Sequence, residues 1–193
     1  MSIYMPVKHH HGGTRSPEYA LLGFLYDQPN HGYILQKQLV TELGHVWHVS
    51  QSQTYAILKR LVNQGDISSS TLEQKKLPAR QLLEISAKGR RRFKDWLDTP
   101  SGGSVRSIRL EFITRLYFAQ RLYPDRIQNM IEDETADINA ALLRLETARD
   151  AIPPEQPFNR LSLDLRIRQL HSVRDWLGEC RKTLKIKVKR GTA

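Results

Sequence analysis

The chain has 193 residues, a formal net charge of +10 at pH 7, 39% hydrophobic residues and a single cysteine, Cys180. This length and apolar content fit a globular protein of one or two domains and exclude a disordered chain. One cysteine excludes a disulfide framework and a multi-cysteine zinc site within the chain, and we expect Cys180 to be an ordinary helix residue. The positive charge indicates a polyanionic partner.

The N-terminal residues lack the apolar segment of a signal peptide, and no apolar run is long enough to cross a bilayer. We therefore expect a cytoplasmic protein with no membrane partner. Residues 1–15 have no periodicity and include His9, His10 and His11, which predicts a flexible arm. Adjacent histidines on such an arm lack the fixed geometry of a metal site, so we expect no metal ion and no other cofactor.

Two helices are predicted between residues 16 and 44. Ser16-Pro17-Glu18 is typical of a helix start, and Pro29 stops the first helix. Asn30 is expected to cap the second helix, which ends at Gly44. Its apolar face recurs every four residues and consists of Leu35, Leu39 and Leu43.

A third helix is predicted from Ser50 to Gly65. Ser50 and Gln53 have the spacing of a capping box, in which each side chain accepts a hydrogen bond from the other residue's backbone N–H. Gly65 is expected to end the helix. The stripe expected to face the core consists of Tyr55, Leu58, Leu61 and Val62.

The pattern then changes to that of strands. Residues 67–72 and 82–85 predict a hairpin around a basic loop that contains Lys75, Lys76 and Arg80. Three helices followed by such a hairpin, the wing, predict a winged helix-turn-helix domain at residues 16–98. Ser86 is expected to cap one more helix, whose apolar residues are Phe93, Trp96 and Leu97.

The remainder of the chain is predicted to be helical. Residues 99–106 are rich in Gly, Ser and Pro and predict a linker, residues 107–185 a helical dimerisation domain, and residues 186–193 a basic tail. The fold class is therefore mainly α with a small β-hairpin. The last long helix, from 161 to 184, presents one apolar side as a two-fold partner surface: Leu163, Ile167, Leu170, Val173, Trp176 and Leu177. The alternative is that this stripe packs within its own chain.

The third helix carries the main candidate for binding. The face opposite its apolar stripe is polar and free of carboxylates, as a helix that enters the DNA major groove requires. Gln and Asn pair with adenine edges, Arg and Lys with guanine or phosphate, and Ala permits close approach. The candidate DNA-binding residues here are Ser50, Gln51, Ser52, Gln53, Ala56, Lys59, Arg60 and Asn63. The alternative is an ordinary solvated helix face.

Two further groups are expected beside this helix. Lys75, Lys76 and Arg80 of the wing are expected to contact phosphate or a minor groove. His31 and Tyr33, at the start of the second helix, either contact phosphate beside exposed backbone N–H groups or pack the turn. The basic run from Arg90 to Lys94 fits a solvated helix face paired with Asp95 and Asp98.

The chain resembles the PadR family of transcriptional regulators. The resemblance lies in Tyr19–Gly23, His31–Tyr33, Ser50–Gly65 and "ISAKGRRRFKDWL" at 85–97. In the second half, "EFITRLYFAQRL" and "RIRQLHSVRDWL" resemble the helical domain of virulence-activator regulators. Two departures are Ala56, where the family commonly has proline after Tyr55, and Leu83, where it often has tyrosine.

The resemblance implies a function. It implies a homodimer that binds double-stranded DNA at a short inverted repeat near a promoter, usually as a repressor. Some members bind aromatic or multidrug-like small-molecule effectors. No nucleophile motif or phosphate-binding glycine loop is present, so we expect no enzyme activity.

Three alternatives remain open. A ligand-sensing protein would use Trp47, Trp96 and Trp176 to line an aromatic pocket, although core packing explains each tryptophan equally well. A protein-interaction adaptor would use the winged helix for protein contacts. The acidic residues Glu132, Asp133, Glu134 and Asp137 would either hold a cation or form a solvated helix face.

Overall fold

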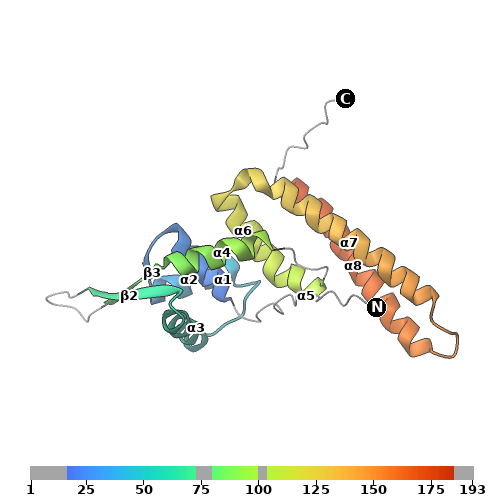
Figure 1. Cartoon of the computed structure of the whole chain (residues 1–193), viewed down its shortest axis with the longest axis horizontal. Coiled ribbons are helices and arrows are strands. Elements are labelled where there is room, and N and C mark those ends of the chain that lie inside the picture. The colour runs from blue at the N-terminus through green and yellow to red at the C-terminus, as the bar shows by residue number, and fades with distance from the viewer. Residues whose placement is uncertain (1–16, 73–79, 100–103, 185–193) are drawn as a thin grey trace, which may run out of the picture. The chain divides into compact units, whose positions relative to one another are not determined.

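The computed structural model describes residues 17–72, 80–99 and 104–184, and the chain divides into two compact units, Met1–Asp98 and Thr99–Ala193 (Figure 1). The predicted arm, the wing residues Lys75 and Lys76, and the predicted tail lie outside the described residues. So does the middle of the predicted linker at 99–106, and a helix already begins at Val105, before that linker was expected to end.

The first unit combines four helices with a small sheet, which confirms the predicted fold class. Its elements are α1 (Glu18–Asp27), β1 (Asn30–His31), α2 (Gly32–Leu43), α3 (Gln51–Asn63), β2 (Ile67–Leu72), β3 (Arg80–Ile85) and α4 (Ala87–Asp98). In Figure 1, β2 and β3 extend side by side away from the helices, as a wing does.

The sheet has three strands rather than the two of the predicted hairpin. All neighbours are antiparallel in the order β1-β3-β2, and β2 and β3 pair from Ile67 with Ile85 to Leu72 with Arg80. The prediction that Asn30 caps α2 was wrong. Asn30 pairs with Leu83 of β3, because this extended segment satisfies its backbone groups at the open edge of β3. Helix α2 therefore starts only at Gly32.

Aliphatic and aromatic side chains hold the first unit together. Helix α2 buries its three predicted leucines, Leu35, Leu39 and Leu43. Helix α4 likewise buries Phe93, Trp96 and Leu97. Each such side chain contributes about 1.5–3 kcal/mol to the free energy of folding on full burial. This core therefore holds α2 and α4 in place within the first unit. Trp47 and Trp96 both have the core packing that was the alternative to a ligand pocket, and Trp96 stacks on Tyr19 with ring centroids 4.6 Å apart.

The second unit is built from helices. They are α5 (Val105–Ser107), the π-helix η1 (Ile108–Phe112), α6 (Ile113–Leu122), the 3-10 turn η2 (Pro124–Arg126), α7 (Ile127–Asp150) and α8 (Pro157–Thr183). Figure 1 shows α7 and α8 as a long pair lying side by side. Helix α7 ends before Pro153 and Pro154, and α8 begins at Pro157, before the predicted start at 161. No described helix of either unit has both the length and the apolar composition needed to span a membrane.

Most of the predicted dimerisation stripe packs within the second unit, as the alternative had it. Ile167, Leu170 and Leu177 are 5%, 4% and 1% exposed, because they face α7 and α5 in the unit's own core. Val173 and Trp176 are partly buried against the same core, and Leu163 is half-buried. The apolar residues of α8 that remain exposed are different ones: Phe158, Leu161 and Leu165.

The acidic residues of α7 do not form one solvated face. Glu132 and Asp133 are exposed, whereas Glu134 is 3% exposed. Among the described residues, no group of three or more His, Cys, Asp or Glu side chains is placed to hold a metal ion.

Candidate nucleic-acid interface

Helix α3 begins with the capping box that the sequence predicted. The backbone N–H of Gln53 donates to Ser50 Oγ at 3.2 Å, and the backbone N–H of Ser50 donates to Gln53 Oε1 at 2.8 Å. These two bonds satisfy backbone donors that a helix start otherwise leaves unpaired. They also occupy the side-chain oxygen of Gln53, a residue that the sequence assigned to base contacts.

The end of α3 is equally well defined by local chemistry. Gly65 adopts a φ of 70°, a left-handed conformation that favours glycine, and this confirms it as the helix terminator. The N–H of Gly65 donates to Val62 O at 2.9 Å, and the N–H of Asp66 donates to Leu61 O at 3.0 Å. This pair of bonds is the Schellman motif, which turns the chain sharply from α3 towards β2.

The buried side of α3 differs from the predicted stripe. Leu58 and Leu61 are buried as expected, but Tyr55 is 43% exposed and Val62 is half-buried. The other buried positions are Thr54 and Ile57. Thr54 tolerates burial because its hydroxyl donates to Ser50 O at 3.1 Å. The buried side of α3 is therefore rotated from the predicted stripe towards Thr54 and Ile57. A helical projection that counts only large apolar residues does not reveal this, because Thr54 is polar.

Tyr55 lies at the edge of α3 that meets α2. A Cβ added to Gly32 would lie 3.0 Å from Tyr55 Cε1 and 3.4 Å from Leu58 Cδ1, so the two helices approach closely at this glycine. Beside it, the His31 ring donates a hydrogen bond from Nδ1 to Gln81 O at 2.9 Å, and the same ring stacks on Tyr33. Tyr33 is 49% exposed.

The outer surface of α3 is exposed, polar and free of carboxylates. Every residue of α3 that the sequence proposed for DNA contact is exposed: Gln51, Ser52, Gln53, Ala56, Lys59, Arg60 and Asn63. Ser50, at the cap, is exposed as well. No acidic side chain belongs to this helix, so nothing on it repels a polyanion.

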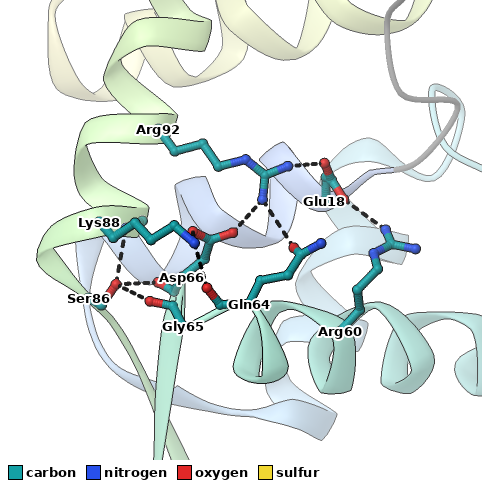
Figure 2. A network of polar contacts seen from close by, with 9 residues as sticks. Glu18, Arg60, Gln64, Gly65, Asp66, Ser86, Lys88 and Arg92 are labelled. Carbon is teal, nitrogen blue, oxygen red and sulfur yellow. Dashed lines mark hydrogen bonds and ion pairs between the residues drawn. The ribbon is translucent and has the colours of Figure 1, made fainter. Parts of the chain in front are cut away.

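A buried acidic residue of α1 joins α3 to α4, and the sequence analysis did not find this contact. Glu18 is 2% exposed, and its two carboxylate oxygens bind two arginines (Figure 2). Arg60 Nη2 of α3 lies 2.7 Å from Glu18 Oε2, and Arg92 Nη2 of α4 binds Glu18 Oε1. The residues are 42 and 74 positions apart in the chain, so no local pattern could have revealed the pairs.

Asp66 completes the same cluster behind α3. It is 1% exposed and binds Arg92 Nη1 at 2.5 Å, while Lys88 Nζ lies 3.6 Å away (Figure 2). Burial disfavours the charged form of Arg92, but the nearby Glu18 and Asp66 carboxylates outweigh it and raise the pKa of Arg92. Arg92 is therefore not part of the solvated basic face that the sequence favoured, and its partners are not Asp95 or Asp98.

Arg80 lies in a strand of the wing. Arg80 was expected in the loop, but its backbone belongs to β3, where it pairs with Leu72. The loop is accordingly shorter than predicted, because the ladder between β2 and β3 continues to this residue pair. Lys75 and Lys76 lie outside the described residues, so their contact with phosphate stays a prediction.

Two family models match separate parts of the chain. Residues 21–95 match the sequence model of the transcriptional regulator PadR-like family, and residues 108–185 match that of the virulence activator alpha C-terminal family. The chain is 28% identical over 131 residues to the negative transcriptional regulator PadR of Bacillus subtilis, covering 67% of this chain and 70% of the relative.

The solved structures that match the chain include that regulator in two complexes. The structure with operator DNA has a TM-score of 0.41 and 23% identity, and the match covers 86% of this chain and 98% of that one. The structure with p-coumaric acid has a TM-score of 0.38 and 23% identity, covering 89% and 96%. The chain therefore carries a PadR-like transcriptional regulator domain at residues 21–95 and a virulence activator alpha C-terminal domain at residues 108–185.

Proposed function

We propose that this transcriptional regulator binds double-stranded DNA as a homodimer and represses transcription. The observation that carries the proposal is the exposed, carboxylate-free outer surface of α3. A major groove is about 12 Å wide and admits one α-helix, and base edges in it present donors and acceptors to side chains of this type. On this proposal, α3 lies in the groove and supplies the sequence-specific contacts.

Two neighbouring features support the same orientation. The α2 start beside α3 carries the half-exposed Tyr33 and His31, and His31 caps the helix without a side-chain bond to its backbone N–H groups. Those N–H groups suit a phosphate oxygen. The wing begins where α3 ends, and Lys75 and Lys76 are proposed to contact the adjacent backbone or minor groove.

The homodimer is proposed to form through the second unit. Phe158, Leu161 and Leu165 of α8 are 83%, 61% and 58% exposed and share one face at i, i+3 and i+7, and Leu143 of α7 is 67% exposed. Exposed apolar side chains gathered on one helix face are typical of an interaction site, whereas single ones are not. A two-fold dimer then presents two copies of α3 to half-sites about 34–36 Å apart, which supports binding of an inverted repeat.

The proposed repressor role and the proposed effector are based on the similar protein of Bacillus subtilis. The Bacillus subtilis protein is a negative transcriptional regulator, and its structure has been solved with p-coumaric acid. We therefore expect repression, and an aromatic small molecule as the class of effector. A thermal-shift screen of aromatic acids tests the latter, because a ligand that binds only the folded state raises the unfolding temperature.

Salt-dependent DNA binding tests the central proposal. A duplex selected by the chain from a randomised library and a mixed-sequence duplex of equal length are titrated between 50 and 300 mM salt. For a protein that neutralises Z phosphates, log Kobs falls against log salt with a slope of about −0.9Z. We expect a steep slope on both duplexes and tighter binding to the selected one.

A matched pair of lysine variants shows where the DNA binds. Lys59→Ala on α3 is expected to weaken binding, whereas Lys182→Ala, which removes an exposed lysine of α8, is expected to leave it unchanged. Equal effects of the two variants would place the DNA elsewhere than on α3. Absence of salt-dependent binding by the unchanged chain would favour the protein-interaction adaptor instead.

A further inference from the structure

We infer that Arg60 is a positioning residue, which sets the rotation of α3 through Glu18, and that Ser52, Ala56, Lys59 and Asn63 make the base contacts. The inference rests on the proposed function and divides the exposed residues of α3 into two groups. The sequence had placed Arg60 among the residues that contact guanine or phosphate.

The burial pattern of α3 defines its outward direction. Successive residues of an α-helix are about 100° apart around the axis. The four buried residues, Thr54, Ile57, Leu58 and Leu61, therefore centre on one direction. Ser52, Ala56, Lys59 and Asn63 lie within about 30° of the opposite direction, whereas Arg60 and Gln53 lie about 70° and 90° from it.

The side-chain contacts also separate Arg60 from the outward-pointing residues of α3. Arg60 extends from α3 towards α1, where Glu18 binds it, and Figure 2 shows its side chain rising from the helix towards that carboxylate. Within the described residues, the side chains of Ser52, Lys59 and Asn63 form no hydrogen bond or ion pair. The residues that point outward are thus available to bases, while the side chain of Arg60 is paired with Glu18.

Glu18 is suited to hold Arg60 in place. Its carboxylate is 3% exposed, so leaving it without a counter-charge is costly. The second oxygen binds Arg92, which Asp66 holds in turn, so Glu18 itself cannot turn away. Arg60 therefore connects α3 to a rigid pair formed by α1 and α4.

The rotation of α3 matters for recognition because base contacts are short and directional. With a helix radius of about 5–6 Å, a rotation of about 20° moves the outer side chains by about 2 Å. A displacement of that size breaks a bidentate contact to a base edge. The core residues oppose large rotations, and the Glu18–Arg60 pair is placed to prevent the small ones.

The test compares Arg60→Met with Lys59→Met, two neighbouring exposed basic residues changed in the same way. Each variant is used to select duplexes from a randomised library and is titrated with salt on a mixed-sequence duplex. We expect Lys59→Met to change a preferred base or to lower the salt slope by about 0.9, as loss of one phosphate contact does. We expect Arg60→Met to keep the base preferences and the slope while weakening the selected duplex by roughly 10-fold.

Two further variants separate positioning from general damage to the fold. Glu18→Gln is expected to weaken DNA binding as much as Arg60→Met does. The double variant is expected to bind DNA no more weakly than either single variant, because both substitutions remove the same ion pair. Arg60→Lys keeps a positive charge near Glu18 and is expected to restore most of the affinity with unchanged base preferences. Circular dichroism confirms that each variant is folded.

The outcomes discriminate between this inference and the proposed function. Suppose first that the unchanged chain binds duplexes with a steep salt slope. If Arg60→Met or Arg60→Lys then selects different bases, or if Arg60→Met lowers the salt slope as Lys59→Met does, Arg60 contacts DNA. Either result overturns the inference. If Glu18→Gln strengthens binding, Glu18 competes with DNA for Arg60, which also overturns it. If the unchanged chain shows no such binding, the proposed function itself fails.

Discussion

The hydroxyl of Ser86 donates a hydrogen bond to the carbonyl oxygen of Gly65 at 2.7 Å, and this bond ties the start of α4 to the residue that ends α3. The same oxygen of Ser86 accepts from the backbone N–H of Gly89 at 3.0 Å, as an N-cap does. One side chain thus links two helix ends that are 21 positions apart. The position of α3 therefore depends on α4 as well as on the core beneath it.

Replacement of Ser86 by alanine tests this link. Loss of the cap and of the bond to Gly65 is expected to lower the free energy of unfolding by about 1–2 kcal/mol. Ser104→Ala is the control, because Ser104 precedes α5 without a side-chain capping bond, and it is expected to change little. Urea unfolding measures both. An equal loss in the two variants would show that the Ser86 contacts contribute nothing specific.

Gly89→Ala is expected to be strongly destabilising. A Cβ at this position of α4 would lie 2.1 Å from Asp66 O and 2.9 Å from Ile85 Cγ1, so α4 must shift away from the chain that follows α3. Overpacking of this kind costs about 1–3 kcal/mol or more. Gly178→Ala in α8 has no atom within 4 Å of the added Cβ, and alanine there is expected to stabilise by about 0.5–1 kcal/mol. Thermal unfolding should show the opposite signs, and a stable Gly89→Ala variant would contradict the close approach.

The stability of the second unit is expected to fall between pH 9 and 11 through Cys180. Burial raises the pKa of the Cys180 thiol from 9.0 to about 11. Because the folded state holds the proton more tightly than the unfolded state, this contribution is fully present below pH 9 and is lost as the pH rises towards 11. The loss is at most about 3 kcal/mol.

A comparison with Cys180→Ala isolates this contribution from other groups that titrate at alkaline pH. Urea midpoints of the two proteins are measured at intervals from pH 8 to pH 11. The difference between them is expected to shrink or reverse above pH 9 as the unchanged chain loses stability. A difference that stays constant over the whole range would mean that the thiol is not shielded from water.

Leu161→Glu is expected to weaken the proposed homodimer. Leu161 is 61% exposed within one chain, so a charge there costs little in the monomer but is buried against apolar side chains in the dimer. Ser162→Glu places the same charge on the neighbouring exposed position of α8 and serves as the control. Analytical ultracentrifugation should show Leu161→Glu shifting towards the monomer mass of 22.4 kDa while Ser162→Glu remains a dimer. Identical masses for the two variants would place the interface on another surface.

Features set by neighbouring residues could be predicted from the sequence. The capping box of Ser50 and Gln53, the left-handed turn at Gly65 and the leucine face of α2 each depend on a few consecutive residues, and all three are confirmed. Spacing alone determines these features, because a helix repeats every 3.6 residues and its ends have unpaired backbone groups whatever the rest of the chain does. The polar, carboxylate-free character of α3 belongs to this group.

Features that depend on distant partners needed the tertiary structure. Glu18 and Arg92 are 74 positions apart, and only the packing of α1 against α4 brings the buried carboxylate and the partly exposed guanidinium together. Tyr55 has the apolar character of a core residue, yet Gly32 of α2 leaves room for its ring at the helix edge. Nothing local to either residue distinguishes these outcomes.

The sequence by itself thus determined the order of the long helices, both ends of α3 and the leucine face of α2, while the tertiary structure decided what covers each apolar face. In α8 the stripe of Ile167, Leu170 and Leu177 is covered by the chain's own helices, and Phe158, Leu161 and Leu165 are left exposed. The physical reason is that hydrophobic burial is non-directional, so an apolar stripe indicates that it will be buried but not against which partner.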